Sequence, residues 1–234
     1  LGRDIATTPG SVVYETPFMQ LIQYEATTKD VYKKPLLIIP PWINKFYILD
    51  LREDNSFIKW AVDQGHTVFV VSWVNPDESY RDKSFDDYVE GGIFAALEGV
   101  EKATGEREVN AIGYCIGGTL LAATLARMAD ENDNRISSVT FFAAQVDFEE
   151  AGELRMFTDP QQVDSIEKLV SKDGYLSAGF MASTFNMLRA NDLIWFFHVN
   201  NYLMGKEPPK FDLLYWNGDS TRFPAKLLID YLRD

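Results

Sequence analysis

The sequence is poor in cysteine, in histidine and in long apolar runs. Its 234 residues include one cysteine, Cys115, and two histidines. A single thiol cannot form an internal disulfide, which favours a reducing compartment such as the cytoplasm. The apolar runs at 35–42 and 67–74 fall far short of the ~20 residues that cross a bilayer, so we expect no transmembrane segment. No charged segment followed by an apolar stretch opens the chain, and therefore no secretory signal is predicted.

Basic side chains are scarce as well. There are 22 Lys and Arg against 35 Asp and Glu, which gives a formal net charge of −13. A negative surface repels phosphate backbones, so nucleic-acid binding is not expected, and no basic cluster favours an anionic membrane. The hydrophobic fraction of 46% is that of a globular protein, which excludes a disordered chain.

The first 150 residues alternate strand-like and helix-like patterns. Strands are predicted at 11–14, 21–24, 36–39, 67–73, 109–114 and 138–144, and helices at 57–62, 84–105 and 117–129. This alternation predicts an α/β fold with a mostly parallel sheet covered on both faces. Helical segments and aromatics dominate later, where only 211–216 could be a strand. We therefore expect an α/β core over 1–150 and a helical cap region over 151–234.

Cys115 lies in the run Gly113-Tyr114-Cys115-Ile116-Gly117, between a predicted strand and a predicted helix. This is the nucleophile-elbow pattern Gly-x-Ser-x-Gly of α/β-hydrolases, with sulfur in place of oxygen. Glycines are needed because side chains two positions from the nucleophile would collide in the tight turn. The helix N-terminus favours the thiolate, and the Ile116 N–H can bind an oxyanion. The alternative is a buried core cysteine beside two chance glycines, which the strand-turn-helix context disfavours.

The other parts of such a site have weaker signals. Residues 40–45 follow the strand at 36–39, where this architecture places its second oxyanion N–H, although the prolines there could simply end the strand. His66 precedes the nucleophile and is expected at the surface. His198 has the right order but lies in an aromatic helical run. Asp147 follows a strand, as an acid could, or caps the next segment. We expect the C-terminal strands that carry the acid and histidine in this fold to be missing from the chain.

Three segments together resemble polyhydroxyalkanoate synthases. They are Pro-Trp-Ile-Asn-Lys-Phe-Tyr-Ile-Leu-Asp-Leu at 41–51, Gly-Tyr-Cys-Ile-Gly-Gly at 113–118 and Phe-Asp-Leu-Leu-Tyr-Trp-Asn-Gly-Asp-Ser-Thr at 211–221. The opening 1–10 also resembles the start of that family's catalytic domain. The Pro-x-Ile-Asn-Lys form and residues 145–148 are most similar to class I enzymes, which favour short-chain hydroxyacyl-CoA. The resemblance covers nearly the whole chain.

The resemblance implies an acyltransferase with an α/β-hydrolase core and a cap. In it, Cys115 accepts the acyl group of an (R)-3-hydroxyacyl-CoA, CoA leaves, and the acyl group passes to a growing polyester. By motif match, the backbone N–H groups of Ile43 and Ile116 form the oxyanion hole. The family's catalytic Asp and His come from motifs beyond the cap that do not occur here, and Asp147 matches an Asp-Phe pair that is not its acid. The 234-residue chain alone is therefore expected to be inactive.

The expected partners also follow from the resemblance. They are the 3-hydroxyacyl-CoA, the polyester and its granule, and a second copy in a homodimer, in the cytoplasm. No cofactor and no metal is expected, since the CoA thioester is a substrate. Two alternatives remain open at this point. One is a cysteine-nucleophile hydrolase of small esters, lactones or thioesters, and the other is a non-catalytic binding module, whose aromatics over 180–216 either meet a partner or form the cap's own core.

Overall fold

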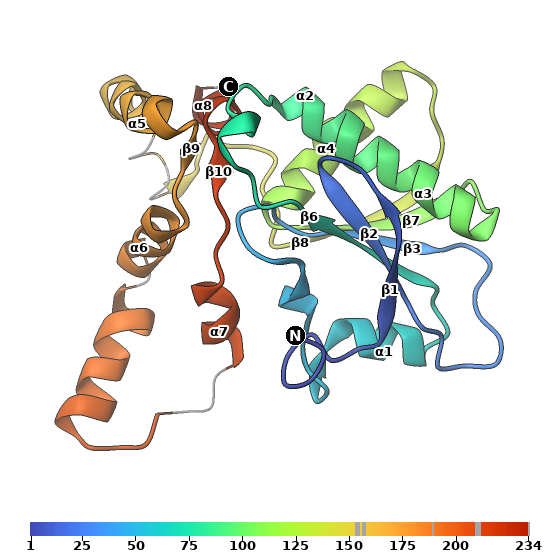
Figure 1. Cartoon of the computed structure of the whole chain (residues 1–234), viewed down its shortest axis with the longest axis horizontal. Helices are drawn as coiled ribbons and strands as arrows, with labels where there is room; N and C mark the ends of the chain where they lie inside the picture. The colour runs from blue at the N-terminus through green and yellow to red at the C-terminus, as the bar shows by residue number, and fades with distance from the viewer. Residues whose placement is uncertain (153–154, 156–157, 189, 209–211, 234) are drawn as a thin grey trace.

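A central sheet of six strands organises the first part of the chain, which we describe from a computed structural model covering residues 1–152, 155, 158–188, 190–208 and 212–233. The spatial order of the strands is β1-β2-β6-β3-β7-β8 (Figure 1). Their bounds are Gly10–Glu15 for β1, Met19–Tyr24 for β2, Leu36–Ile39 for β3, Val68–Trp73 for β6, Val109–Tyr114 for β7 and Ile136–Phe142 for β8. β6, β3, β7 and β8 run parallel, and β1 and β2 pair antiparallel at one side. This confirms the mostly parallel sheet.

Helices cover both faces of the sheet, as predicted. They are α1 Phe57–Asp63, α2 Phe85–Tyr88, the π-helical η3 Val89–Phe94, α3 Ala95–Thr104 and α4 Ile116–Asp130. α1 lies on one side of the sheet, and α2, α3 and α4 lie on the other (Figure 1). Strand β3 shows the consequence for burial. Leu36 and Ile38 belong to the cluster that includes α1, while Leu37 and Ile39 belong to the cluster that includes α3 and α4, because successive side chains of a strand point to opposite faces.

The chain is helical within the predicted range 84–105, but the range consists of three consecutive helical elements and not of one uniform helix. Ser84 and Asp87 form a capping box at its start, and Gly105 ends it with a φ of 76°. Between α2 and α3 the backbone widens into the π-helical η3. The last predicted strand of the core, 138–144, is also shifted: β8 begins at Ile136 and ends at Phe142.

Residues after 150 form short helices with little sheet. The elements are α5 Pro160–Asp173, β9 Tyr175–Leu176, α6 Ala178–Leu188, the π-helical η5 Asn191–Trp195 and η6 His198–Leu203, α7 Asp212–Gly218, β10 Phe223–Pro224 and α8 Ala225–Arg233. The possible strand at 211–216 is wrong, since 212–218 are helical; residue 211 lies outside the described residues. Leu213 and Trp216 are three positions apart, which places both on one helix face against Tyr47 and Leu51.

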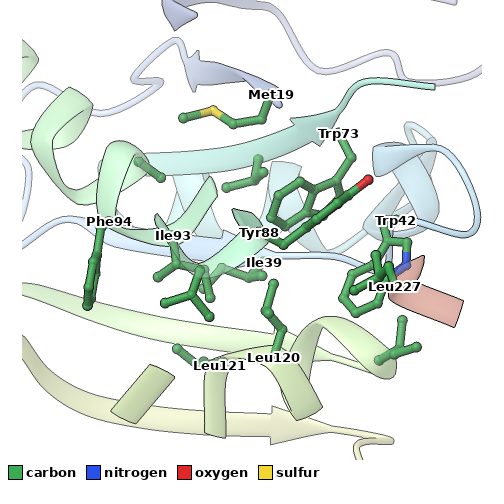
Figure 2. Close-up of a cluster of buried hydrophobic side chains, with 14 of the residues drawn as sticks. Met19, Ile39, Trp42, Trp73, Tyr88, Ile93, Phe94, Leu120, Leu121 and Leu227 are labelled. Atoms are coloured by element: carbon green, nitrogen blue, oxygen red, sulfur yellow. The ribbon is translucent and has the colours of Figure 1, made fainter. Parts of the chain in front are cut away.

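The cap region and the core share side-chain packing. Leu227 of α8 lies in the same buried cluster as Trp42, Trp73 and Tyr88 (Figure 2). The division into 1–150 and 151–234 stays a prediction. Four short elements complete the described fold: η1 Phe46–Leu49, β4 Asp50–Arg52, β5 Asn55–Ser56 and η2 Glu78–Tyr80. Among the described helices, none combines the length and apolar character that crossing a bilayer requires.

Candidate active site

Cys115 occupies the sharp turn between β7 and α4. Its backbone has φ of 53° and ψ of −131°, a conformation that costs a non-glycine residue about 1–3 kcal/mol and that persists only where the surroundings enforce it. The turn projects the thiol at the carboxyl end of the parallel strands, just before the first turn of α4. A strained strand-turn-helix junction of this kind is the nucleophile elbow that the sequence predicted.

The glycines of the elbow are required by close backbone approach. A Cβ added to Gly117 would lie 2.5 Å from the carbonyl oxygen of Ile39 and 2.6 Å from that of Pro40. A Cβ on Gly113 would lie 2.5 Å from the Cα of Gly118. A real Cβ atom does not come this close to a backbone atom that is not bonded to it, so only glycine fits. The same contacts bring the end of β3, and the loop that follows it, directly against the elbow.

The electrostatics of the thiol differ from the sequence-based expectation. Burial raises the pKa of Cys115 above its ordinary value of 9.0, and the hydrogen bond from the Ile116 N–H, which favours the thiolate, is the smaller effect. A buried thiolate loses more hydration than one N–H restores. The helix N-terminus therefore does not by itself keep Cys115 ionised at neutral pH.

A residue that the sequence reasoning missed, Tyr231, lies close to the nucleophile. Burial, and secondly the charge of a Cys115 thiolate, raise the pKa of the Tyr231 phenol to about 12. The Tyr231 ring meets Phe148 edge-on, with centroids 5.7 Å apart. Helix α8 thus comes within electrostatic range of the thiol, and the segment after β8 packs on that helix. No sequence signal connects Tyr231 with Cys115, because 116 positions, from 115 to 231, separate them.

The two predicted oxyanion donors, the N–H groups of Ile116 and Ile43, differ in their hydrogen bonding. The Ile116 N–H is directed at the Cys115 sulfur. Ile43 belongs to the loop after β3 that the Gly117 contacts place beside the elbow, and among the described residues no hydrogen bond takes up its N–H. A backbone donor without a partner, in a loop whose first residue lies against the elbow, is available to a ligand. The oxyanion-hole assignment of Ile43 and Ile116 stays a prediction.

Neither histidine of the chain contacts the elbow. His66 packs on Tyr32, with ring centroids 4.9 Å apart, just before β6. Both β6 and β7 run parallel to β3, so His66 lies at the amino edge of the sheet, about 20 Å, one strand length, from the carboxyl edge where Cys115 lies. His198 stacks on Tyr202 at 5.4 Å in the cap, and its segment, drawn in orange, extends away from the sheet (Figure 1).

Asp147 has a local role in the structure. Its side chain is exposed and accepts a hydrogen bond from the backbone N–H of Glu149 at 3.0 Å, while its carbonyl accepts one from Gln145 Nε2 at 3.0 Å. This is the capping of its own turn that the sequence left open as an alternative. Nothing connects Asp147 with either histidine.

The segments 42–55 and 212–221, far apart in the sequence, are bound to each other. The hydrogen bonds between them run from Tyr47 Oη to Asp219 Oδ2 (2.7 Å), from Trp216 Nε1 to the Lys45 carbonyl (2.8 Å), from Arg52 Nε and Asn55 Nδ2 to Asp212 Oδ2 (3.0 Å each) and from Asn44 Nδ2 to Ser220 Oγ (3.4 Å). Thr221 adds two more, from its hydroxyl to the Trp42 carbonyl at 2.5 Å and from its N–H to the Ile43 carbonyl at 3.2 Å. Segment 212–221 therefore holds the loop that carries Ile43.

The parallel sheet, the helices on both faces and the strained cysteine elbow define the class of protein. The chain belongs to the α/β-hydrolase fold family, whose sequence profile matches residues 34–233. Among solved structures, a probable hydrolytic enzyme from Pseudomonas aeruginosa PAO1 is similar in fold, with a TM-score of 0.50, 12% identity and coverage of 92% of this chain and 60% of that one.

Within this fold, the chain is similar to poly(3-hydroxyalkanoate) polymerases along its whole length. The profile for the N-terminus of poly-beta-hydroxybutyrate polymerase (PhaC) matches residues 1–61. The chain is 59% identical over 234 residues to the poly(3-hydroxyalkanoate) polymerase subunit PhaC of Rhizobium meliloti (strain 1021), and 41% identical over 238 residues to that of Cupriavidus necator (strain ATCC 17699). It is covered completely in both comparisons and spans 38% and 40% of those relatives. The predicted resemblance is confirmed.

Proposed function

We propose that this chain carries the nucleophile of a polyester synthase. Cys115 attacks the thioester carbonyl of an (R)-3-hydroxyacyl-CoA and becomes acylated, and the acyl group then passes to the hydroxyl at the end of the growing polyester. The observation that carries the proposal is the cysteine held in the strained elbow of a chain similar throughout to polymerases of this name. A thiolate suits a thioester because the exchange is between sulfurs of similar leaving ability.

The proposed step balances in atoms and protons. The bond from the Cys115 sulfur to the acyl carbon forms, the bond from that carbon to the CoA sulfur breaks, and the thiol proton reaches the departing CoA thiolate through a base. The negative charge on the carbonyl oxygen is stabilised by the backbone N–H groups of Ile43 and Ile116. In the second step the same base removes the proton of the incoming hydroxyl, whose oxygen bonds to the acyl carbon. The bond from that carbon to the Cys115 sulfur breaks, and the base returns the proton to the Cys115 thiolate. The substrates supply all the chemistry, so the proposal includes no cofactor.

The base is not supplied by either histidine of this chain. His66 lies at the opposite edge of the sheet, and His198 lies in the cap on Tyr202. With the pKa of the Cys115 thiol raised, the unassisted thiol is mostly protonated at neutral pH. We therefore propose that the 234-residue chain alone does not turn over. The relatives named as polymerases extend well beyond the part that the chain matches.

The proposed setting follows the same similarity. The chain would act in the cytoplasm, at the granule that its polyester forms, as part of a homodimer. Preference for short acyl chains, which the class I resemblance implies, is part of the proposal.

The test is CoA release from (R)-3-hydroxybutyryl-CoA, followed by product analysis. We expect none from this chain alone, and steady release with insoluble polymer from the protein at the length its gene encodes. Cys115→Ala should abolish that release, while the exposed α5 variant Ser165→Ala should keep it. Steady release by the 234-residue chain would contradict the missing base. Free 3-hydroxybutyrate in place of polymer would indicate a thioesterase.

A further inference from the structure

The peptide unit between Trp42 and Ile43 lies in the loop after β3 and is bound to a distant part of the chain. A peptide is planar, and in the trans form its C=O and N–H point in opposite directions; no cis peptide occurs among the described residues. The carbonyl of this unit is that of Trp42, and the N–H is that of Ile43, which has no acceptor among the described residues and which the proposed function makes an oxyanion donor. Whatever fixes the direction of the Trp42 carbonyl therefore also fixes the direction of the Ile43 N–H.

The group that fixes this carbonyl is the hydroxyl of Thr221. It donates to the Trp42 carbonyl at 2.5 Å, across 179 positions of the sequence, and the Thr221 N–H donates to the next carbonyl, that of Ile43, at 3.2 Å. Thr221 and Trp42 are each only 1% exposed, so water cannot replace the bond. Thr221 thus holds both the Trp42 carbonyl and the Ile43 carbonyl. These two hydrogen bonds prevent the Trp42–Ile43 peptide plane from rotating.

We propose that Thr221 is a positioning residue for acyl transfer, which aims the Ile43 N–H at the oxygen of the acyl group on Cys115. The inference rests on the proposed role of Cys115 as acyl acceptor. Loss of an oxyanion-hole donor costs about 10²–10³ in rate, and a misaimed donor costs part of that. If Thr221 served only the stability of the fold, its replacement would lower that stability but would leave the ratio of acylation to alkylation rates at Cys115 unchanged.

The test compares two reagents at Cys115, the only thiol of the chain. Iodoacetamide alkylates at a tetrahedral carbon and forms no oxyanion, whereas p-nitrophenyl butyrate acylates through one. Both rates are measured in mildly alkaline buffer, the second as the burst of p-nitrophenolate. In Thr221→Val the ratio of acylation to alkylation should fall about tenfold or more. In Thr221→Ser, which keeps the hydroxyl, the ratio should stay within about threefold of the original.

A matched control is Thr124→Val. Thr124 is fully buried in α4 and its hydroxyl also donates to a backbone carbonyl, that of Leu120 at 2.8 Å. This variant should lose stability but keep the ratio. If Thr221→Val does not fold, Thr221→Ala replaces it, since the smaller side chain clashes with nothing. An unchanged ratio in the folded variant, or an equal fall in Thr221→Ser, would overturn the inference.

The outcome is separable from that of the proposed function. p-Nitrophenyl butyrate carries neither CoA nor a 3-hydroxyl, so the ratio depends on the elbow and its oxyanion donors alone. If CoA release from hydroxyacyl-CoA is never found but the ratio responds to Thr221→Val, the proposed function fails and the positioning role stands. If CoA is released with a ratio insensitive to Thr221, only the positioning role fails.

Discussion

At the scale of single residues, Cys115 combines a strained backbone with a thiol whose pKa is raised by burial. The strain is maintained because Gly113 and Gly117 let the backbones of β3 and α4 close around the turn. The same closure buries the sulfur, and burial outweighs the N–H of Ile116 in setting the pKa. The backbone geometry at Cys115 is thus that of a nucleophile elbow, while burial acts against the thiolate. Activation requires a base or a cation near the sulfur.

The raised pKa predicts how Cys115 reacts with iodoacetamide. Because only the thiolate reacts, the alkylation rate should keep rising with pH through and beyond 9.0, the ordinary value. The urea-unfolded chain, measured alongside, should instead reach half of its maximal rate at the lower, ordinary pKa of a free thiol and level off above it. Mass spectrometry follows the reaction without ambiguity. A plateau below neutral pH in the folded chain would contradict this and would show that a base or cation stabilises the thiolate.

The elbow glycines predict a second effect at this scale. In Gly117→Ala the new methyl group would meet the backbone oxygens of Ile39 and Pro40 at 2.5 and 2.6 Å. Backbone cannot move aside as a side chain can, so we expect the free energy of unfolding to fall by about 3 kcal/mol.

Gly179→Ala in α6 is the matched control, because nothing lies within 4 Å of its added Cβ. Alanine is the better helix former by about 1 kcal/mol, so this variant should be neutral or slightly more stable. Urea unfolding measures both. Equal stability of the two variants would mean that the elbow is looser than its contacts indicate.

At the scale of elements, the binding of 212–221 to 42–55 positions the loop after β3. Helix α7 contributes an apolar face, Leu213 and Trp216, against the cluster around Tyr47 and Leu51. Its first residue, Asp212, adds a nearly buried carboxylate, 8% exposed, that accepts hydrogen bonds from Arg52 and Asn55. Apolar contact supplies most of the binding free energy in such an arrangement, and the polar contacts determine its register.

Asp212→Asn should weaken this contact in a pH-dependent way. Burial acts to raise the pKa of Asp212, but the hydrogen bonds from Asn55 and Arg52 outweigh it and hold the pKa below 3.8. A lowered pKa in the folded state means that the carboxylate stabilises fully above about pH 3.8 and loses this effect as the pH falls further. At neutral pH we expect a loss of about 1–2 kcal/mol in the free energy of unfolding.

The measurement is the difference between wild type and variant in urea unfolding at several pH values. That difference should shrink toward zero as the pH falls below 3.8. Asp230→Asn, which removes one partner of the exposed Lys226–Asp230 pair, should cost only about 0.5 kcal/mol. A pH-independent difference for Asp212→Asn would show that the hydrogen bonds, and not the charge, carry its effect.

At the scale of the whole molecule, the two ends of the parallel strands carry different candidate residues. The carboxyl ends and the amino ends are here called the carboxyl edge and the amino edge of the sheet. Strand ends at the carboxyl edge carry Cys115 and the loop of Ile43, whereas His66 lies at the amino edge. The cap region contributes Tyr231 and Thr221 to the carboxyl ends of the strands, and its segment that includes η6 extends away from the sheet (Figure 1). A site at this edge is where open α/β sheets in general bind ligands.

Much of this molecule follows from local sequence patterns. The strands at 36–39 and 109–114, the helix after Cys115 and the cap at Ser84 were predictable, because side-chain period, capping residues and glycines act within a few positions. The elbow was predictable for the same reason. The segment at 211–216 was not, since a short apolar run lacks a clear period, and contact with Tyr47 and Leu51 favours the helix.

By itself the sequence determined the parallel core and the elbow around Cys115, since each depends on residue types and short spacings. Only the tertiary structure decided that Tyr231 comes within electrostatic range of Cys115, that burial raises the pKa of the thiol, and that Thr221 holds the peptide before Ile43. These facts depend on contacts across 100 residues or more and on the loss of water around buried groups. No local pattern encodes them, because burial is a property of the packed whole.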